Sequence, residues 1–281
     1  MACGTKLKRT RFAPSPTGPL HLGHALAALI ASERADQGEF LLRIEDLDRS
    51  RARAEWEAQI FDDLAWLGLT WQQPVMRQSE RAEPYQAALD LLTAKGLTYR
   101  CACTRADIRE ALNAPQEGAP ILGPDGLVYP GTCRDKHLAD APTIRLNLRA
   151  ALKTLPDLPC FTETGLQAGV HAVDQDWLIT HCGDVILSRK DMGAAYHLAV
   201  VVDDAAQGIT EVTRGEDLFE ATFIHVLLQA LLGLPTPRYH HHRLIRDASG
   251  KRLAKRDDAR AISTYRAAGM VPEAVKALIG L

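Results

Sequence analysis

The fourteen residues from Arg11 to His24 constrain the fold more than any other part of the sequence. At their start, Thr10–Ala13 predicts a short strand. Three prolines and a glycine then force a loop, and the apolar spacing from Leu20 onward predicts a helix. The N-terminus of a helix exposes unpaired N–H groups and the positive end of its dipole. This succession of strand, loop and helix therefore predicts a site for a polyanion.

Two histidines at the start of the predicted helix support that interpretation. His21 and His24 are three residues apart, so they share one helix face and can both donate to phosphate oxygens. Gly18 and Gly23 allow a phosphate or a flat ring to approach the backbone closely. The alternative is a proline-rich loop followed by a helix with two surface histidines. The length of the whole string favours the binding site.

Apolar runs and periodic segments in the rest of the chain predict an α/β fold. At roughly 150 residues per domain, 281 residues allow one large domain or two modest ones. Two expected helices end beside Gly68 and Gly96, where glycine is a common stop residue. The expected strands are Phe40–Ile44, Ile144–Leu148, Asp184–Leu187 and the buried parallel strand Leu198–Val202, and the expected helices are Trp56–Leu67, Pro84–Lys95 and Glu220–Leu232.

Composition and charge exclude several classes of protein. With 46% hydrophobic and 24% charged residues, the chain is neither disordered nor collagen-like. No apolar stretch reaches the roughly 20 residues of a membrane helix, and the basic start has no apolar segment after it. We therefore expect a cytoplasmic protein with no membrane partner. The net charge is −2, so RNA contact requires a local basic face, such as the nine Lys/Arg against three Asp between Thr236 and Arg266.

A small inserted module is expected between Leu97 and about Asp140, where periodicity disappears and Gly, Pro and Cys dominate. Cys101, Cys103 and Cys133, with Tyr129 or another oxygen, can make a four-coordinate zinc site. The C-x-C spacing is tighter than the usual C-x-x-C, so spacing alone leaves open that these are buried thiols without a metal.

The remaining cysteines and histidines are expected to be structural. Cys3, Cys160 and Cys182 stand outside the C-x-C pattern, and His171, His181 and His197 are isolated. His240–His242 lies in a strand-like segment, where neighbouring rings point in alternate directions. We therefore expect one or two of these three rings to face a nucleotide and none to bind a metal.

The string RFAPSPTGPLHLGH at Arg11–His24 resembles the HIGH signature of class I aminoacyl-tRNA synthetases, in the glutamyl/glutaminyl branch. KRLAKR at Lys251–Arg256 resembles their second signature, KMSKS, with Lys255 at the position of the second lysine. The sequence departs from the family at Ala254, usually Ser, and at Arg252, where the consensus starts with Lys. A mobile basic loop of this kind supplies cations for departing pyrophosphate. The resemblance implies that His21, His24 and Lys255 are catalytic, and that these three and Gly23 bind ATP with Mg²⁺.

Three further resemblances imply a glutamate pocket. AYHLAVVVDD at Ala195–Asp204 and VTRGED at Val212–Asp217 are similar to two segments of the family, and this similarity assigns Tyr196 and Arg214 to the pocket. RIEDLD at Arg43–Asp48 is similar to the family's RIEDTD segment, in which the glutamate holds the substrate ammonium, and such a side chain suits an α-amino group by charge. Asp46 and Asp48 can instead be Mg²⁺ ligands or helix caps, and we expect a cap at Asp48. A guanidinium that matches a side-chain carboxylate predicts glutamate rather than glutamine as the substrate. The implied glutamate-binding residues are Arg11, Ala13, Ser15, Glu45, Tyr196 and Arg214.

The resemblance also implies the architecture: a Rossmann-type doubly wound parallel sheet, an inserted zinc-binding and acceptor-contact module, and a short C-terminal helical stem-contact segment. The expected segments are 1–96 and 183–235 for the two halves of the catalytic domain, 97–182 for the module, and 236–281 for the KMSKS-like loop and truncated stem-contact region. Short relatives share the CxC…Yx₃C pattern, which implies Cys101, Cys103, Tyr129 and Cys133 as the ligands of one structural Zn²⁺.

Only 25 residues follow Arg256, which leaves no material for the anticodon-binding domain expected of a full glutamyl-tRNA synthetase. This resembles the glutamyl-queuosine tRNA(Asp) synthetase group. The resemblance implies a monomer that activates L-glutamate with ATP, without needing tRNA, and attaches it to queuosine at the wobble position of tRNA(Asp). The alternatives are a minimal glutamyl-tRNA synthetase acting on a tRNA 3′ end, a non-catalytic tRNA-binding paralogue, and another HxGH nucleotidyltransferase. The combination of motifs argues against the last.

Overall fold

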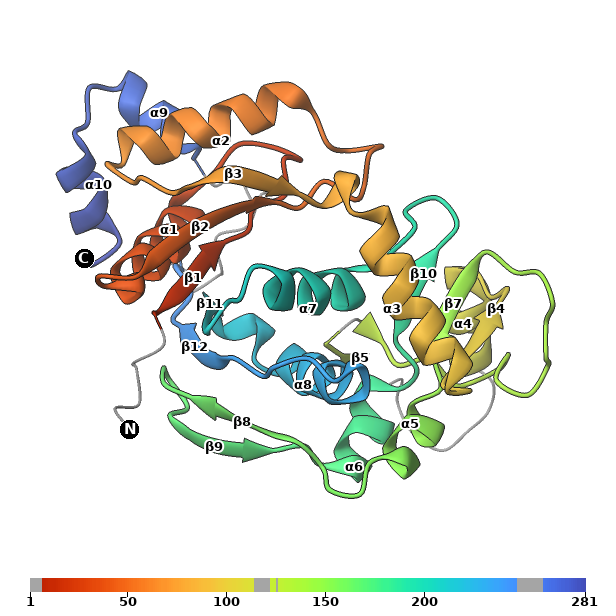
Figure 1. The fold of residues 1–281 in the computed structure, drawn as a ribbon. Coiled ribbons are helices and arrows are strands. Elements are labelled where there is room, and N and C mark those ends of the chain that lie inside the picture. The colour runs from red at the N-terminus through yellow and green to blue at the C-terminus, as the bar shows by residue number, and fades with distance from the viewer. Residues whose placement is uncertain (1–6, 114–121, 125, 247–259) are drawn as a thin grey trace.

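The computed structural model describes residues 7–113, 122–124, 126–246 and 260–281. Figure 1 shows strands β3, β2, β1, β11 and β12 side by side, with β8 and β9 beyond β12, and with β4, α4 and β7 at the opposite end from α9 and α10. The first half of the chain contains β1 (Arg9–Phe12), α1 (Leu22–Ala35), β2 (Glu39–Ile44), α2 (Ala54–Trp66), β3 (Gln72–Arg77) and α3 (Ala82–Ala94). The second half contains β10 (Ile186–Arg189), α7 (Tyr196–Ala206), β11 (Glu211–Gly215), α8 (Ala221–Leu232), β12 (Arg238–His242), α9 (Ile262–Ala267) and α10 (Pro272–Leu278).

The inserted part has a structure of its own. It contains β4 (Thr98–Cys101), α4 (Arg105–Asn113), β5 (Leu122–Gly123), β6 (Gly126–Leu127), β7 (Thr143–Leu146), α5 (Leu148–Thr154), β8 (Cys160–Glu163), β9 (Gly169–Ala172) and α6 (Gln175–Trp177). Strand β7 pairs antiparallel with both β4 and β10. Strand β8 pairs with β12, so the insertion shares two sheets with the rest of the chain, and its β5 and β6 pair with each other.

A parallel sheet carries the N-terminal motif. β1 pairs with β2, β2 with β3, and β11 with β12, all in parallel. The two groups of strands adjoin because Thr210 N–H donates to Arg9 O over 3.0 Å beside the start of β11. The carboxyl ends of β1 and β11 therefore lie at one edge, where α/β proteins bind ligands. This confirms the expected α/β fold with a parallel sheet.

Helix α1 packs closely on this sheet because its inner face carries small residues. Ala25, Ala28 and Ala31 are fully buried, and Thr10 Oγ1 of β1 donates to Ala31 O over 2.6 Å. Ile262 and Val275, from α9 and α10, belong to the same apolar core. The C-terminal helices therefore pack against the part of the fold that holds the histidine motif.

The expected strand Leu198–Val202 is wrong, because this run lies inside helix α7. The helix is buried on most of its circumference between other elements, so its apolar residues do not follow the one-sided spacing of a surface helix. A short apolar run fits a buried strand equally well, and periodicity alone does not separate the two. The other expected strands and helices are present, with ends shifted by a few residues.

The expected cap at Asp48 is also wrong. Its carboxylate accepts hydrogen bonds from Ser50 Oγ and Arg51 Nε, and α2 begins after Arg53 without a side-chain cap. Asp46 instead accepts from Ser79 N–H and Oγ. Within the described ranges, no helix combines the length and apolar character needed to cross a bilayer.

Candidate active site

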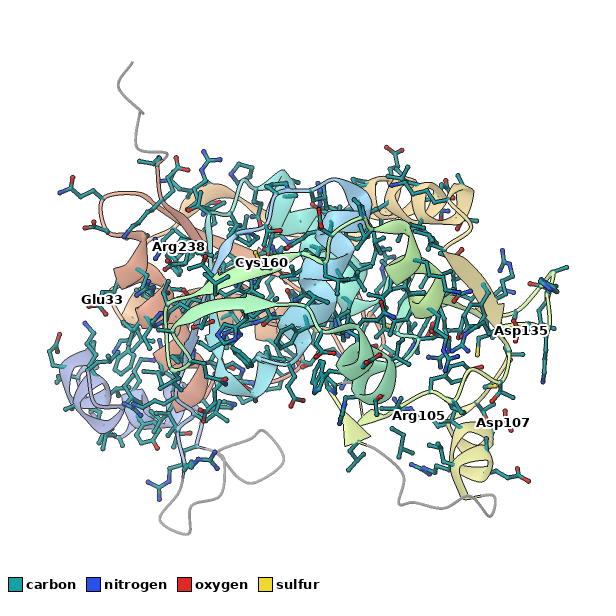
Figure 2. All side chains as sticks on the ribbon, turned by 90° about the horizontal axis from the view of Figure 1, so that it is seen from below. Glu33, Arg105, Asp107, Asp135, Cys160 and Arg238 are labelled. Atoms are coloured by element: carbon teal, nitrogen blue, oxygen red, sulfur yellow. The ribbon has the colours of Figure 1, made fainter. Side chains whose placement is uncertain are left out.

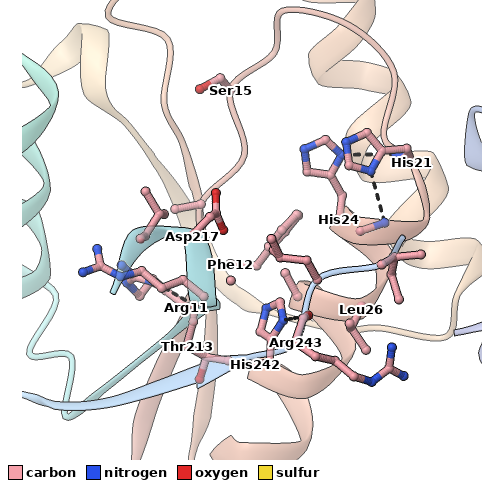
Figure 3. Close-up of a pocket in the computed structure, with 18 of the residues that line it drawn as sticks. Arg11, Phe12, Ser15, His21, His24, Leu26, Thr213, Asp217, His242 and Arg243 are labelled. Atoms are coloured by element: carbon pink, nitrogen blue, oxygen red, sulfur yellow. Dashed lines mark hydrogen bonds between the residues drawn. The ribbon is translucent and has the colours of Figure 1, made fainter. Parts of the chain in front are cut away.

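Both histidines of the first motif lie at the N-terminus of α1 and are held by the backbone. His21 Nδ1 accepts from Gly23 N–H, and His24 Nδ1 accepts from His21 N–H, each over 3.1 Å. The two rings stack with centroids 3.8 Å apart (Figure 3). Because Nδ1 accepts in each neutral ring, the ring proton sits on Nε2. Both rings are therefore set up as Nε2–H donors.

Gly23 leaves room for the His21 ring beside the helix N-terminus. A Cβ at this position would lie 3.0 Å from Cε1 and 3.1 Å from Nδ1 of His21. Any larger residue at 23 would therefore push the His21 ring away from the backbone N–H that it caps.

One cleft of about 440 Å³ gathers the predicted ATP- and glutamate-binding residues, including those of Figure 3. This volume falls in the range of small-molecule sites. Every such residue that the structure describes lines it: Arg11, Ala13, Ser15, His21, Gly23, His24, Glu45, Tyr196 and Arg214. Lys255 lies outside the described residues.

The Arg214 side chain is buried against uncharged acceptors. Its Nε donates to His241 Nε2 over 3.1 Å, its Nη1 to His225 Nδ1 over 3.0 Å, and its Nη2 to Thr222 Oγ1 over 2.7 Å. Arginine always donates, so these contacts fix which nitrogen of each histidine carries the proton. Among the described residues, Arg214 forms no ion pair with a carboxylate, and its side chain lines the cleft, so its charge is available to a ligand there.

His241 and His225, which accept hydrogen bonds from Arg214, each donate one to a further side chain. His241 Nδ1 donates to Glu163 Oε2 over 2.6 Å, and His225 Nε2 donates to His197 Nδ1 over 2.9 Å. Burial and the adjacent Arg214 charge hold the pKa of His225 well below its usual value. Burial is also the main reason that the pKa of His241 is lowered. The rings that hold Arg214 therefore remain neutral.

Arg11 differs from Arg214 because it is neutralised. Its Nε and Nη2 donate to the two oxygens of Asp204, over 2.9 and 3.2 Å. Asp204 also accepts from Arg43, whose side chain is fully buried. Burial opposes ionisation of Asp204, but Arg11 and Arg43 lower its pKa below the usual value. Asp204 thus positions two guanidinium groups beside the cleft.

Glu45 supplies a carboxylate to the same cleft. Its side chain is 12% exposed, and its Oε1 accepts from Arg43 Nη2 over 3.3 Å. Burial raises the pKa of Glu45 above its usual value, against the opposing effect of Arg43. Burial likewise raises the pKa of Tyr196, so its hydroxyl stays protonated. The cleft therefore combines cations, carboxylates and a phenol.

Sequence reasoning missed part of the cleft. Asp217, Arg243 and Ile245 also line it. His242 was not missed, because its place in the cleft agrees with the expected alternation of rings in β12: His241 points to Arg214 while His242 faces the cleft. Asp204, which holds Arg11 and Arg43, was harder to find from the sequence, where it is marked only as a carboxylate at the end of an apolar run.

The two cysteines of the C-x-C pattern lie close to Cys133, the third cysteine of the expected zinc site. One sulfur atom from each of Cys101, Cys103 and Cys133 lies within 4.8 Å of the other two. Tyr129 Oη lies 3.3 Å from Cys101 Sγ and 3.5 Å from Cys103 Sγ. Burial opposes ionisation of Cys133, but hydrogen bonds from Tyr129, Ala102 N–H and the other thiols lower its pKa to about 7. Three thiols and a phenol in this arrangement are a donor set that suits Zn²⁺.

The isolated histidines are hydrogen bonded, as expected for structural residues, and His197 Nδ1 accepts from His225. His171 and His181 bond to the backbone oxygens of Gln167 and Trp177. Cys160 and Cys182 stand apart from the cysteine cluster. Cys3 lies outside the described residues.

Comparisons with known proteins agree with this site. The family described as tRNA synthetases class I (E and Q), catalytic domain, matches residues 8–281. The Glutamyl-Q tRNA(Asp) synthetase of Rhodobacter capsulatus is 60% identical over 279 residues, which cover 97% of this chain and 99% of that protein. The protein of the same name from Nocardia farcinica is 45% identical over 272 residues, or 96% of this chain and 82% of that protein.

A solved structure extends the comparison to the fold. The glutamate–tRNA synthetase of Elizabethkingia anophelis superposes with a TM-score of 0.78 at 26% identity, over 98% of this chain. The match spans 61% of that longer protein. The chain therefore belongs to the class I tRNA synthetases of the E and Q type, in the group of the glutamyl-Q tRNA(Asp) synthetases.

Proposed function

We propose that this protein activates L-glutamate with ATP and transfers the glutamyl group to queuosine in tRNA(Asp). The observation that carries the proposal is the single cleft in which histidine donors, Arg214 and Glu45 meet. The names of the relatives, with 60% identity in one case, support the acceptor.

His21 and His24 bind the phosphates of ATP in this proposal. Their Nε2–H groups and the N-terminus of α1 supply donors and positive potential where negative charge develops. Lys255 adds a cation for the pyrophosphate, and Mg²⁺ enters with ATP and neutralises part of the triphosphate charge. The protein contributes placement and electrostatics, with no covalent enzyme intermediate.

Glutamate carries two carboxylates and one ammonium, and the cleft offers a complementary set. Arg214 has its donors held by neutral groups, so it attracts a substrate carboxylate most strongly. Glu45 suits the ammonium. Arg11, Ala13, Ser15 and Tyr196 line the remaining wall. Glutamine lacks the second carboxylate and is disfavoured.

The reaction has two steps. In the first, a carboxylate oxygen of glutamate attacks the α-phosphorus of ATP, the bond to the bridging oxygen breaks, and pyrophosphate leaves with the electron pair. In the second, a hydroxyl of queuosine attacks the carbonyl carbon of the glutamyl adenylate, and the bond to the phosphate oxygen breaks. AMP leaves, and the hydroxyl proton passes to solvent. The residues proposed for activation all belong to this chain, so we expect the first step to need no tRNA.

Zinc has a structural role in this proposal. Cys101, Cys103, Cys133 and Tyr129 hold one Zn²⁺ that ties β4 to the segment before β7. The site is separate from the cleft, so the metal stabilises the inserted part and takes no part in the chemistry.

Two assays test the proposal. ATP–pyrophosphate exchange with glutamate is expected without tRNA, and exchange that appears only when tRNA is added refutes the activation step. Transfer of labelled glutamate is then measured with tRNA(Asp) from cells that make queuosine and from cells that do not. We expect transfer to the first alone. Equal transfer to both, or charging of a 3′ end in tRNA(Glu), supports a minimal glutamyl-tRNA synthetase instead.

A further inference from the structure

Strand β12 brings into the catalytic cleft a histidine that the proposed chemistry does not use. The strand runs from Arg238, exposed at the surface (Figure 2), to His242, which is 7% exposed and lines the cleft. The alternation of rings along this strand predicted that a ring faces a nucleotide. The sequence did not indicate what that ring recognises.

One hydrogen bond fixes the position of the proton on this ring. His242 Nδ1 lies 2.9 Å from Arg243 O (Figure 3), and a carbonyl oxygen can only accept, so Nδ1 carries the proton. Burial lowers the pKa of His242 below its usual value, so the ring is neutral at neutral pH. A neutral ring with its proton on Nδ1 has an acceptor at Nε2. His21 and His24 therefore present donors to the cleft, whereas His242 presents an acceptor.

The Nε2 acceptor of His242 is buried without a hydrogen-bond partner in the described part of the chain. A buried polar atom of this kind costs stability unless water or a ligand completes it. Thr213 Oγ1, from the neighbouring strand β11, is likewise buried without a partner, and Thr213 lines the same cleft. A hydroxyl can rotate to donate or to accept, but the ring has one fixed role. The cleft therefore suits a ligand that donates a hydrogen bond to His242.

The apolar residues of the cleft suit a flat base. Leu244 and Ile245 follow His242 in the chain, and Leu26 and Ala27 line the cleft from helix α1. Ligand sites typically combine such an apolar lining with a few polar groups that fix the orientation of the ligand. The adenine base is the part of ATP that combines an apolar surface with a hydrogen-bond donor, its exocyclic amine. The ribose and the phosphates offer no comparable apolar face.

We propose that His242 selects ATP over GTP by accepting, at Nε2, a hydrogen bond from the exocyclic amine of adenine. The inference rests on the proposed function, because that function places ATP in this cleft. Guanine carries a carbonyl oxygen at the same ring position, which would put two acceptors opposite each other in a buried site. A site that is built to bond a donor rejects an analogue that lacks it. His242 is therefore a specificity-determining residue for the nucleotide.

The test combines variants with nucleotide analogues, so that lost recognition is separated from a general loss of activity. Purine riboside triphosphate lacks the exocyclic amine, and inosine triphosphate carries an oxygen in its place. His242→Leu removes the acceptor, and His242→Gln offers a side-chain oxygen instead. The matched control is His240→Leu, which removes a ring of the same strand that bonds to Thr164 Oγ1 and is not among the residues that line the cleft. Thermal unfolding checks that the variants fold.

We expect the unmodified protein to exchange pyrophosphate with a kcat/KM roughly tenfold higher for ATP than for purine riboside triphosphate, and to prefer ATP over inosine triphosphate by more. In His242→Leu, kcat/KM is expected to fall roughly tenfold with ATP but less than about threefold with purine riboside triphosphate. His242→Gln is expected to keep part of the preference for ATP, and His240→Leu all of it. An equal fall with both nucleotides in His242→Leu overturns the proposal, because a structural role affects them alike.

Two further measurements separate the alternatives. If His242→Leu loses the preference for ATP over 2′-deoxy-ATP or 3′-deoxy-ATP but keeps the preference over purine riboside triphosphate, the ring contacts the ribose, and the proposal is overturned. If the unmodified protein binds ATP in a calorimetric titration but shows no exchange with glutamate, the proposed function is wrong, and the same variants and analogues are compared by their Kd. Equal affinity of the unmodified protein for ATP and purine riboside triphosphate, or no binding of either, overturns the role of His242.

Discussion

Replacing Thr222 with valine tests whether the neutral groups around Arg214 position it for glutamate. Valine keeps the shape of threonine but removes the oxygen that accepts from Arg214 Nη2 over 2.7 Å. The site is fully buried, so water cannot replace that oxygen. A hydrogen bond to a charged group contributes about 1.5–3 kcal/mol. If about half of the 3 kcal/mol, or about 1.5 kcal/mol, is lost from the free energy of glutamate binding, the KM for glutamate rises roughly tenfold.

The matched variant is Thr222→Ser, which keeps the hydroxyl but loses a methyl group. Removal of one buried carbon in Thr222→Ser costs about 1 kcal/mol of stability, and Thr222→Val loses a buried hydrogen bond. Both variants are therefore expected to unfold at a lower temperature than the unmodified protein. Only the valine variant is expected to raise the KM for glutamate, with kcat nearly unchanged, because a group that binds substrate and transition state equally affects KM. The assay is the glutamate dependence of pyrophosphate exchange. An unchanged KM in Thr222→Val, or an equal rise in Thr222→Ser, refutes the positioning role.

Three other predictions address the helix terminus, the metal and pH. Gly23→Ala is expected to lower the exchange rate at least tenfold with little loss of stability, because its Cβ displaces the His21 ring; a rate within twofold of the unmodified protein contradicts this. Cys101→Ser is expected to abolish the one equivalent of zinc measured by atomic emission, whereas Cys160→Ser keeps it; equal zinc in both variants refutes the site. Burial opposes ionisation of Glu163, but hydrogen bonds from His241 and from the backbone lower its pKa from 4.5 to about 2. Its ionised form therefore stabilises the fold fully above about pH 4.5, and this contribution of about 3 kcal/mol is lost as the pH falls towards 2. The free energy of unfolding, measured with urea, is expected to fall less between about pH 5 and pH 3 in Glu163→Gln than in the unmodified protein. An equal fall in both proteins argues against this role of Glu163.

Local sequence signals predicted those elements whose ends are marked by particular residues. Gly68, Gly96 and Gly233 each adopt a positive φ next to the end of a predicted helix. α7 also ends beside a glycine with a positive φ, Gly208, but its buried circumference removes the periodicity that identifies a surface helix, so the apolar run inside it was interpreted as a strand. The cleft residues quoted for the family motifs were found because each motif is contiguous in sequence. The uncharged residues that hold Arg214 were not found from the sequence, because they come from two separate elements, α8 and β12.

By itself, the sequence determined the strand, loop and helix that carry His21 and His24, the cysteine pattern, and the family to which the motifs belong. These properties depend on residues close together in the chain, where backbone preferences and spacing act directly. Tertiary structure decided which charges are neutralised and which are left for a ligand. Arg11 meets Asp204 across 193 positions of sequence, whereas Arg214 hydrogen bonds to neutral partners. The role of a charged side chain depends on the groups that folding places beside it. The spacing of residues in the sequence does not show how far apart such groups lie in the folded protein.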